Sequence, residues 1–240
     1  MIFENYPKKR PELPAEYQKI YTGHYKKNRD GKTSASALSR KMEAWMHKKV
    51  AEDLKGNTGK STLEIGAGTL NQLDYENTRP YDIVEPFTEL FSKSTSKSKV
   101  DGIYNDINDI ELTKRYDRIT SVATFEHITD LPAVVAKTCL LLNKSGTLRV
   151  SIPNEGTFLW KLGYSLTTGI EFRLLYGLDY DGLMKYEHVN TAYEVEQIIR
   201  YFYQDIKTSC FGIHKKMAFY KFFECRNPIV DRANKYIALL

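Results

Sequence analysis

A short apolar segment near residue 63 ends in Gly66-Ala67-Gly68, two glycines separated by one residue. Such a turn lets the backbone approach a ligand closely at the carboxyl edge of a parallel sheet. The next apolar segment, Tyr81–Val84, ends in Glu85, where folds of this kind place an acid against two ribose hydroxyls. The glycine turn and the acid together predict a ligand that contains adenosine.

Two details distinguish between classes of adenosine cofactor. The dinucleotide fingerprint needs a further glycine at position 71, where this chain has Asn71. Glu64 precedes the first glycine by two residues, and a carboxylate there would repel a pyrophosphate but suits a cofactor with an ammonium and a sulfonium. These residues favour S-adenosylmethionine. An NAD(P)-dependent oxidoreductase and a binding protein that lacks turnover are the alternative hypotheses.

Five segments, in order, make the chain resemble the class I S-adenosylmethionine-dependent methyltransferases, especially the small-molecule enzymes of ubiquinone biosynthesis. They are Glu64–Gly68, Val84–Pro86, Asn105–Ile107, Tyr116–Ile128 and Leu141–Asn154, within residues 59–154. The resemblance implies that cofactor contacts come from Glu64, Gly66, Ala67, Gly68, Glu85, Pro86, Asp106, Ile107 and Thr124. Within this set, Glu85 would bind the ribose and Asp106 the adenine amino group. A structural alternative for Asp106 is a cap on the turn that follows it.

The resemblance also implies a Rossmann-like α/β fold with a doubly wound, mostly parallel sheet. Its strands are expected at Ser61–Ile65, Tyr81–Val84, Gly102–Tyr104, Arg118–Ala123 and Thr147–Ile152, with a closing pair at Ile206–Ile213 and Met217–Glu224. Helices are expected at Ala37–Leu54, Leu131–Leu142 and Thr191–Tyr203. Leu70 replaces the third glycine of the family, and the short distance to the second strand requires a short or irregular first crossover.

The predicted division is an N-terminal arm and helix over residues 1–58, followed by a methyltransferase domain over 59–240. The arm would carry a short helix near Glu16–His24, and residues 154–190 would form an insertion after the fifth strand. Residues 1–60 hold 14 Lys and Arg against 7 Asp and Glu, so a phosphate partner or a solvated helix face would explain the charge.

His127 follows the fourth strand and is our first candidate for a general base, with His188 the second. Either histidine could instead have a structural role. His24, His127 and His188 could supply a metal site, but their spacing does not require one and no metal is predicted.

The expected acceptor is a small molecule with a hydroxyl, such as a sugar or a secondary metabolite. Ala123–Glu126 stands where base-amino methyltransferases carry Asn/Asp-Pro-Pro-aromatic, which argues against nucleic acid. Tyrosines, Trp160 and Glu171 of the insertion could roof a pocket for a polar ring.

Composition indicates a globular protein with no membrane span, since 42% of the residues are hydrophobic and no run approaches about 18 apolar residues. The N-terminus has no apolar signal core, and three cysteines form neither a disulfide framework nor a zinc pattern. A cytoplasmic location is therefore expected.

Overall fold

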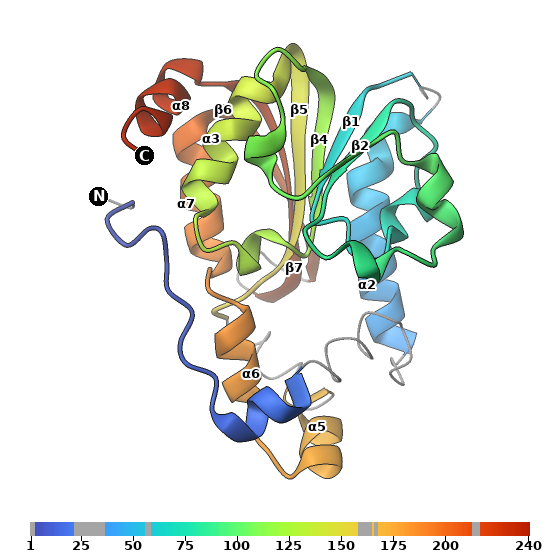
Figure 1. Cartoon of the computed structure of the whole chain (residues 1–240), viewed down its shortest axis with the longest axis vertical. Helices are drawn as coiled ribbons and strands as arrows, with labels where there is room; N and C mark the ends of the chain where they lie inside the picture. The colour runs from blue at the N-terminus through green and yellow to red at the C-terminus, as the bar shows by residue number, and fades with distance from the viewer. Residues whose placement is uncertain (1–2, 22–36, 56–58, 158–164, 166–167, 213–216) are drawn as a thin grey trace.

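The computed structural model describes residues 3–21, 37–55, 59–157, 165, 168–212 and 217–240 (Figure 1). A seven-stranded sheet in the order β3-β2-β1-β4-β5-β7-β6 crosses the molecule. Its strands are β1 (Thr62–Ile65), β2 (Tyr81–Val84), β3 (Gly102–Tyr104), β4 (Tyr116–Val122), β5 (Leu142–Pro153), β6 (Tyr203–Gly212) and β7 (Ala218–Pro228). The first five run parallel, and β7 pairs antiparallel with both β5 and β6. The predicted doubly wound sheet is confirmed.

Strand β5 begins earlier than its sequence pattern predicts. It starts at Leu142, which pairs with Tyr116, and the register shifts between Tyr116 and Arg118 before regular pairing resumes at Thr147. The polar residues from 143 to 146 hide this pairing from an apolar pattern. Strands β2 and β3, by contrast, have the predicted bounds.

Helices cover both faces of the sheet (Figure 1). Helix α2 (Ala37–Ala51) packs on one face, and α3 (Leu131–Leu141), α7 (Ala192–Phe202) and α8 (Val230–Ile237) pack on the other. Asp130 caps α3 through the Ala133 amide, as its position before an apolar run predicts. Helix α8 was not predicted; it is eight residues long, and only Ala233 in it is buried.

The first crossover contains only the 3₁₀ helix Asn71–Asp74, as expected from its length. Leu70 precedes it with a φ of 69°, in the left-handed region that glycine adopts without strain. Its side chain is buried beside Leu73, so apolar burial offsets the cost of that backbone conformation. The third glycine of the family pattern is thus replaced by a residue with the same sign of φ.

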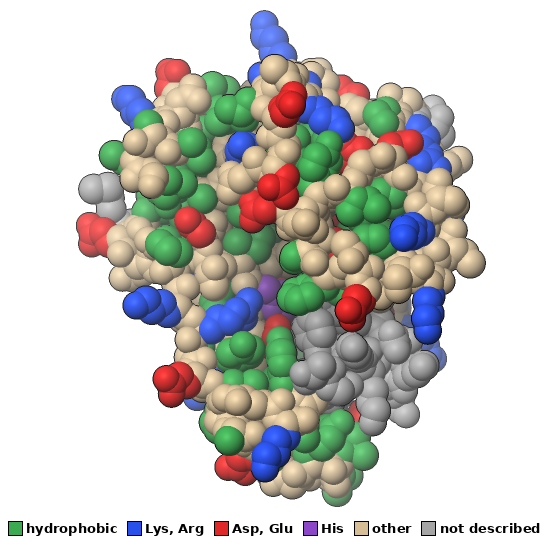
Figure 2. Space-filling model, in the orientation of Figure 1, with side chains coloured by type: hydrophobic (Ala, Val, Ile, Leu, Met, Phe, Trp, Pro, Cys, Tyr) green, Lys and Arg blue, Asp and Glu red, His purple; other side chains and the backbone are tan. Residues whose placement is uncertain are grey.

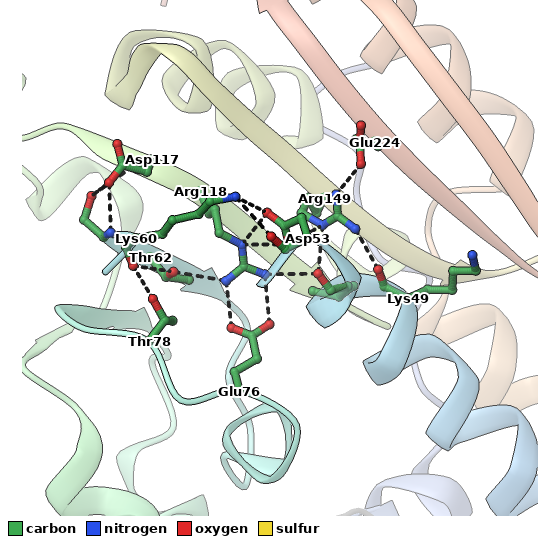
Figure 3. Close-up of polar contacts among 12 residues, drawn as sticks. Lys49, Asp53, Lys60, Thr62, Glu76, Thr78, Asp117, Arg118, Arg149 and Glu224 are labelled. Atoms are coloured by element: carbon green, nitrogen blue, oxygen red, sulfur yellow. Dashed lines mark hydrogen bonds and ion pairs between the residues drawn. The ribbon is translucent and has the colours of Figure 1, made fainter. Parts of the chain in front are cut away.

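The face of the sheet under α2 carries a buried ionic network (Figure 3). Arg118 on β4 forms a bidentate pair with Glu76, at 2.8 and 3.0 Å, and also binds Asp53 beyond α2. Arg149 on β5 binds the same Asp53 at 3.1 Å. Both guanidinium groups donate to the Val50 carbonyl, one of the last carbonyls of α2. Since the end of a helix leaves such carbonyls without helical partners, the two arginines fix α2 to the sheet.

The insertion after β5 forms α5 (Thr168–Tyr176) and α6 (Tyr180–Glu187) at one end of the molecule (Figure 1). The N-terminal arm crosses to this end, where its helix over residues 15–21 packs against both. Leu13, Phe172 and Leu183 form the buried centre of this packing, surrounded by tyrosines of the arm and the insertion. The predicted short helix is confirmed as far as residue 21; His24 and Trp160 lie outside the described residues.

Among the helices described, none is both long and apolar enough to cross a membrane.

Candidate active site

The glycine turn lies at the shared carboxyl edge of β1 and β2. Ile65 pairs with Val84, and the Gly66 amide donates to the Val84 carbonyl at 2.8 Å. Gly66 and Gly68 have φ values of 74° and 52°, which favour glycine. Ala67, between them, is buried in a small apolar cluster. The turn therefore presents its backbone at the sheet edge where the sequence predicts the cofactor.

Glu85 and the glycine turn are in direct contact. The Glu85 carboxylate accepts hydrogen bonds from the Gly68 amide at 2.8 Å and from the Phe87 amide at 3.0 Å. The residue is buried, whereas the following Pro86 is exposed. Each carboxylate oxygen accepts one of these bonds and keeps a second lone pair for a ligand hydroxyl. The arrangement fits the predicted ribose contact, with Pro86 at its outer side.

Glu64 lies in a different environment from the one its sequence position suggests. It is buried, and the Tyr81 hydroxyl donates to its Oε2 at 2.8 Å. Burial raises the pKa of Glu64 to about 8; the Tyr81 hydrogen bond opposes this rise, and the charges of Glu76 and Glu85 add to it. The protonated form is favoured at pH 7 without ligand. The contact of Glu64 with the cofactor stays a prediction.

Asp106 has the structural role that we set against adenine binding. Its Oδ1 accepts from the Asn108 amide at 2.8 Å, and Asp109 accepts from the Asp106 amide at 2.9 Å, which together make a capping box. Ile107 is buried in the main apolar core. The cap uses one carboxylate oxygen of an exposed side chain, so the adenine contact stays a prediction.

Thr124 holds the exit of β4 against the glycine turn. A Cβ added to Gly66 would lie 2.3 Å from both Cγ2 and Oγ1 of Thr124. The Thr124 hydroxyl donates to the carbonyls of Val122 at 3.1 Å and Gly66 at 3.3 Å. The residues that follow, from Phe125 to His127, form a 3₁₀ helix at this same edge. The predicted cofactor turn and the predicted acceptor residues are therefore adjacent.

The structure brings together His127 and His188, which come from segments far apart in the sequence. Their rings meet edge to face with centroids 4.7 Å apart. Nδ1 of His127 is 2.9 Å from the Glu187 carbonyl oxygen, and Nδ1 of His188 is 2.9 Å from Glu155 Oε2. Figure 2 shows histidine in a hollow between the sheet and the end that carries α5 and α6.

Three carboxylates set the electrostatics of the pair. Glu126 is buried beside His127, with 3.8 Å between its Oε1 and the His127 Nε2. Burial of His188 lowers its pKa, but the hydrogen bond that His188 donates to Glu155 and the charges of Glu126 and Glu187 outweigh this, and the pKa of His188 is raised. The surroundings of His188 therefore favour its charged form.

Arg10 in the N-terminal arm ties the two histidine segments together. Its guanidinium donates to the carbonyls of Tyr186 at 2.6 Å, Glu187 at 3.0 Å and His127 at 2.7 Å. Asn190 adds a second tie, donating to the Phe125 carbonyl at 2.9 Å. Sequence reasoning missed both residues: the only signal for Arg10 was a basic, proline-containing arm, and Asn190 ends a segment in which no period is visible.

Residues 35–202 match the family described as methyltransferase domain. The chain belongs to this family. The class I resemblance is confirmed, and the oxidoreductase hypothesis is set aside.

One curated relative is the malonyl-[acyl-carrier protein] O-methyltransferase of Priestia megaterium, 32% identical over 103 residues. That match covers 40% of this chain and 38% of the relative, so the chain matches well under half of that protein.

Solved structures show the same fold at low identity. The plantazolicin methyltransferase BpumL, in complex with a monoazolic desmethylPZN analogue and SAH, has a TM-score of 0.58 at 14% identity, covering 89% of this chain and 91% of that one. The N-methyltransferase NodS from Bradyrhizobium japonicum has a TM-score of 0.56 at 12% identity, covering 88% and 99%. At such identity the likeness supports the fold alone.

Proposed function

We propose that this chain transfers a methyl group to the hydroxyl of a small molecule, with His127 and His188 on the acceptor side. The methyl donor is S-adenosylmethionine. The observation that carries the proposal is the Thr124–Gly66 contact, which sets the histidine pair beside the glycine turn. A direct transfer requires the methyl donor and the acceptor to be held next to each other.

S-adenosylmethionine supplies an activated methyl group: a carbon–oxygen bond forms at the methyl carbon as its bond to sulfur breaks, and that electron pair stays on sulfur. The residues of the chain mainly orient the two molecules. Glu85 holds the ribose, and the backbone of Gly66–Gly68 approaches the cofactor closely. The acceptor hydroxyl loses its proton during the transfer, and the histidine pair with its carboxylates assists that loss.

The proposed acceptor is small because the sheet edge beside the histidines is bordered by the insertion. Several insertion tyrosines pack around Phe172 instead of standing over the site, so the aromatic roof expected for a sugar has less support in the described residues. The Priestia megaterium relative is named for O-methylation, which supports oxygen as the methylated atom. Nucleic acid is not part of the proposal.

Binding of S-adenosylhomocysteine tests the cofactor half of the proposal. Glu85→Gln keeps the size of the side chain but removes the charge that strengthens hydrogen bonds to the ribose. We expect a loss of about 2–4 kcal/mol, or at least about 30-fold in affinity, by calorimetry. Glu89→Gln, in the exposed 3₁₀ turn that follows, is the matched control. Equal affinity of Glu85→Gln and the wild type would contradict the assignment.

The acceptor half is tested with a cofactor whose methyl group carries deuterium. Incubation with a metabolite extract should yield a product heavier by one deuterated methyl group, whose carbon shift identifies a methyl ether or ester. A product methylated on nitrogen would contradict the hydroxyl.

We also propose a cytoplasmic location, because Cys139, Cys210 and Cys225 are free thiols.

A further inference from the structure

We propose that Glu126, His127 and His188 bind one divalent transition-metal ion, which holds the acceptor oxygen. One ligand atom from each residue lies within 4.8 Å of the other two. Donor atoms about 2.1 Å from a shared ion lie no more than about 4.2 Å apart, so small side-chain rotations complete the geometry. The binding site stands on its own residues, whereas its role toward the acceptor rests on the proposed function.

Both imidazole rings are held in the orientation that metal ligands need. The Glu187 carbonyl oxygen can only accept, so His127 Nδ1 carries the proton in their hydrogen bond and Nε2 has the lone pair. The Glu155 carboxylate fixes Nδ1 of His188 in the same way. A carbonyl or a carboxylate on the far nitrogen is the usual support for a metal-binding histidine.

The charge around the rings also calls for a cation. The side chains of Glu126, Glu155 and Glu187 are 2%, 19% and 16% exposed and converge on two imidazoles. Within the described part of the chain, Glu187 Oε1 is buried and accepts no hydrogen bond. Arg10, the nearby guanidinium, donates to backbone carbonyls. A divalent ion would offset the repulsion among the carboxylates.

The ligand types indicate the class of metal. Two imidazole nitrogens and one carboxylate suit Zn²⁺, Mn²⁺, Co²⁺ or Fe²⁺, whereas Mg²⁺ and Ca²⁺ prefer sites made of oxygen atoms. Three protein ligands leave a position for an exchangeable oxygen ligand. Such an ion lowers the pKa of a hydroxyl bound to it, so a hydroxyl acceptor would lose its proton more easily. Glu126 and His127 lie two and three residues after Thr124, which contacts the glycine turn, so the metal site is at the edge of the sheet that carries that turn.

The test is metal binding by the full chain after chelator treatment and dialysis. Calorimetry and metal analysis with Zn²⁺ and Co²⁺ should give one ion per chain, and bound Co²⁺ should show visible absorption. Glu126→Gln and His188→Gln should each weaken binding at least about 100-fold, and Glu155→Gln about 10- to 100-fold. His47→Gln, at a buried histidine that binds Gln72 near α2, should leave the affinity unchanged. A wild type that binds neither ion, or equal binding by Glu126→Gln, would overturn the site.

A measurement on the wild type covers the case in which a variant does not fold. Zn²⁺ should shift the imidazole nitrogen resonances of His127 and His188 but not those of His47, and unshifted signals would overturn the proposal. The outcome is independent of the proposed function. Methyl transfer to a hydroxyl by metal-free protein would refute the ion's role and leave that function intact. Metal binding without any binding of S-adenosylhomocysteine would refute the function and leave the metal site intact.

Discussion

Replacing Glu64 by glutamine should change how the stability of the protein depends on pH. The pKa of Glu64 is about 8 in the folded chain, against an ordinary value of 4.5, chiefly because the carboxyl is buried. Between those pH values the folded protein holds a proton that the unfolded chain has lost. The free energy of unfolding therefore falls as pH rises through this window, by about 1.4 kcal/mol per pH unit. The whole window corresponds to about 5 kcal/mol.

Glutamine has nearly the same shape but does not titrate. Urea denaturation at pH 5, 6, 7 and 8, followed by circular dichroism, should show the wild type losing stability relative to Glu64→Gln at each step. Glu196→Gln is the control, since ion pairs with Arg200 and Lys221 oppose burial and lower the pKa of Glu196, so it is ionised in both states above pH 5. Its curve should run parallel to that of the wild type. A parallel curve for Glu64→Gln as well would refute the argument from burial.

Two further predictions concern the buried network and the arm. Arg118→Met should cost about 3–5 kcal/mol of unfolding free energy, because Glu76 stays buried without the cation that pairs with it. Arg200→Met, on the surface, should cost well under 1 kcal/mol. Urea denaturation midpoints measure both losses. A small loss for Arg118→Met would mean that water reaches Glu76. Arg10→Gln should cost about 2 kcal/mol of unfolding free energy and lower the rate of methyl transfer, while the affinity for S-adenosylhomocysteine stays unchanged. Lys9→Gln, at an exposed position, should change neither the stability nor the rate. If Arg10→Gln also weakened the binding of S-adenosylhomocysteine, Arg10 would act through the stability of the whole fold and not on the acceptor side alone.

Local sequence signals were sufficient for the elements that bear the cofactor turn. Strand β2 is a short segment with three apolar residues of four and an acid directly after it, and its bounds were predicted without error. The cap of α3 was also readable, because Asp130 stands directly before an apolar helical pattern. These features depend on neighbouring residues, which a single sequence displays.

Contacts between distant segments could not be read in the same way. The meeting of His127 with His188 depends on the path of α5 and α6, and the insertion shows no period that fixes this path. Arg118 looked like an ordinary strand residue, yet its partner Glu76 comes from the irregular first crossover. Long-range polar pairing of this kind leaves no periodic trace in the chain.

Arg10 donates to main-chain carbonyls and lies over the Tyr186 ring, so its hydrogen bonds make no demand on the side chains at positions 127 and 187. Substitutions at those positions can alter the shape and charge of the acceptor side without loosening the attachment of the arm. This edge of the molecule can therefore be changed by substitution to fit a new acceptor while the fold beneath it stays the same.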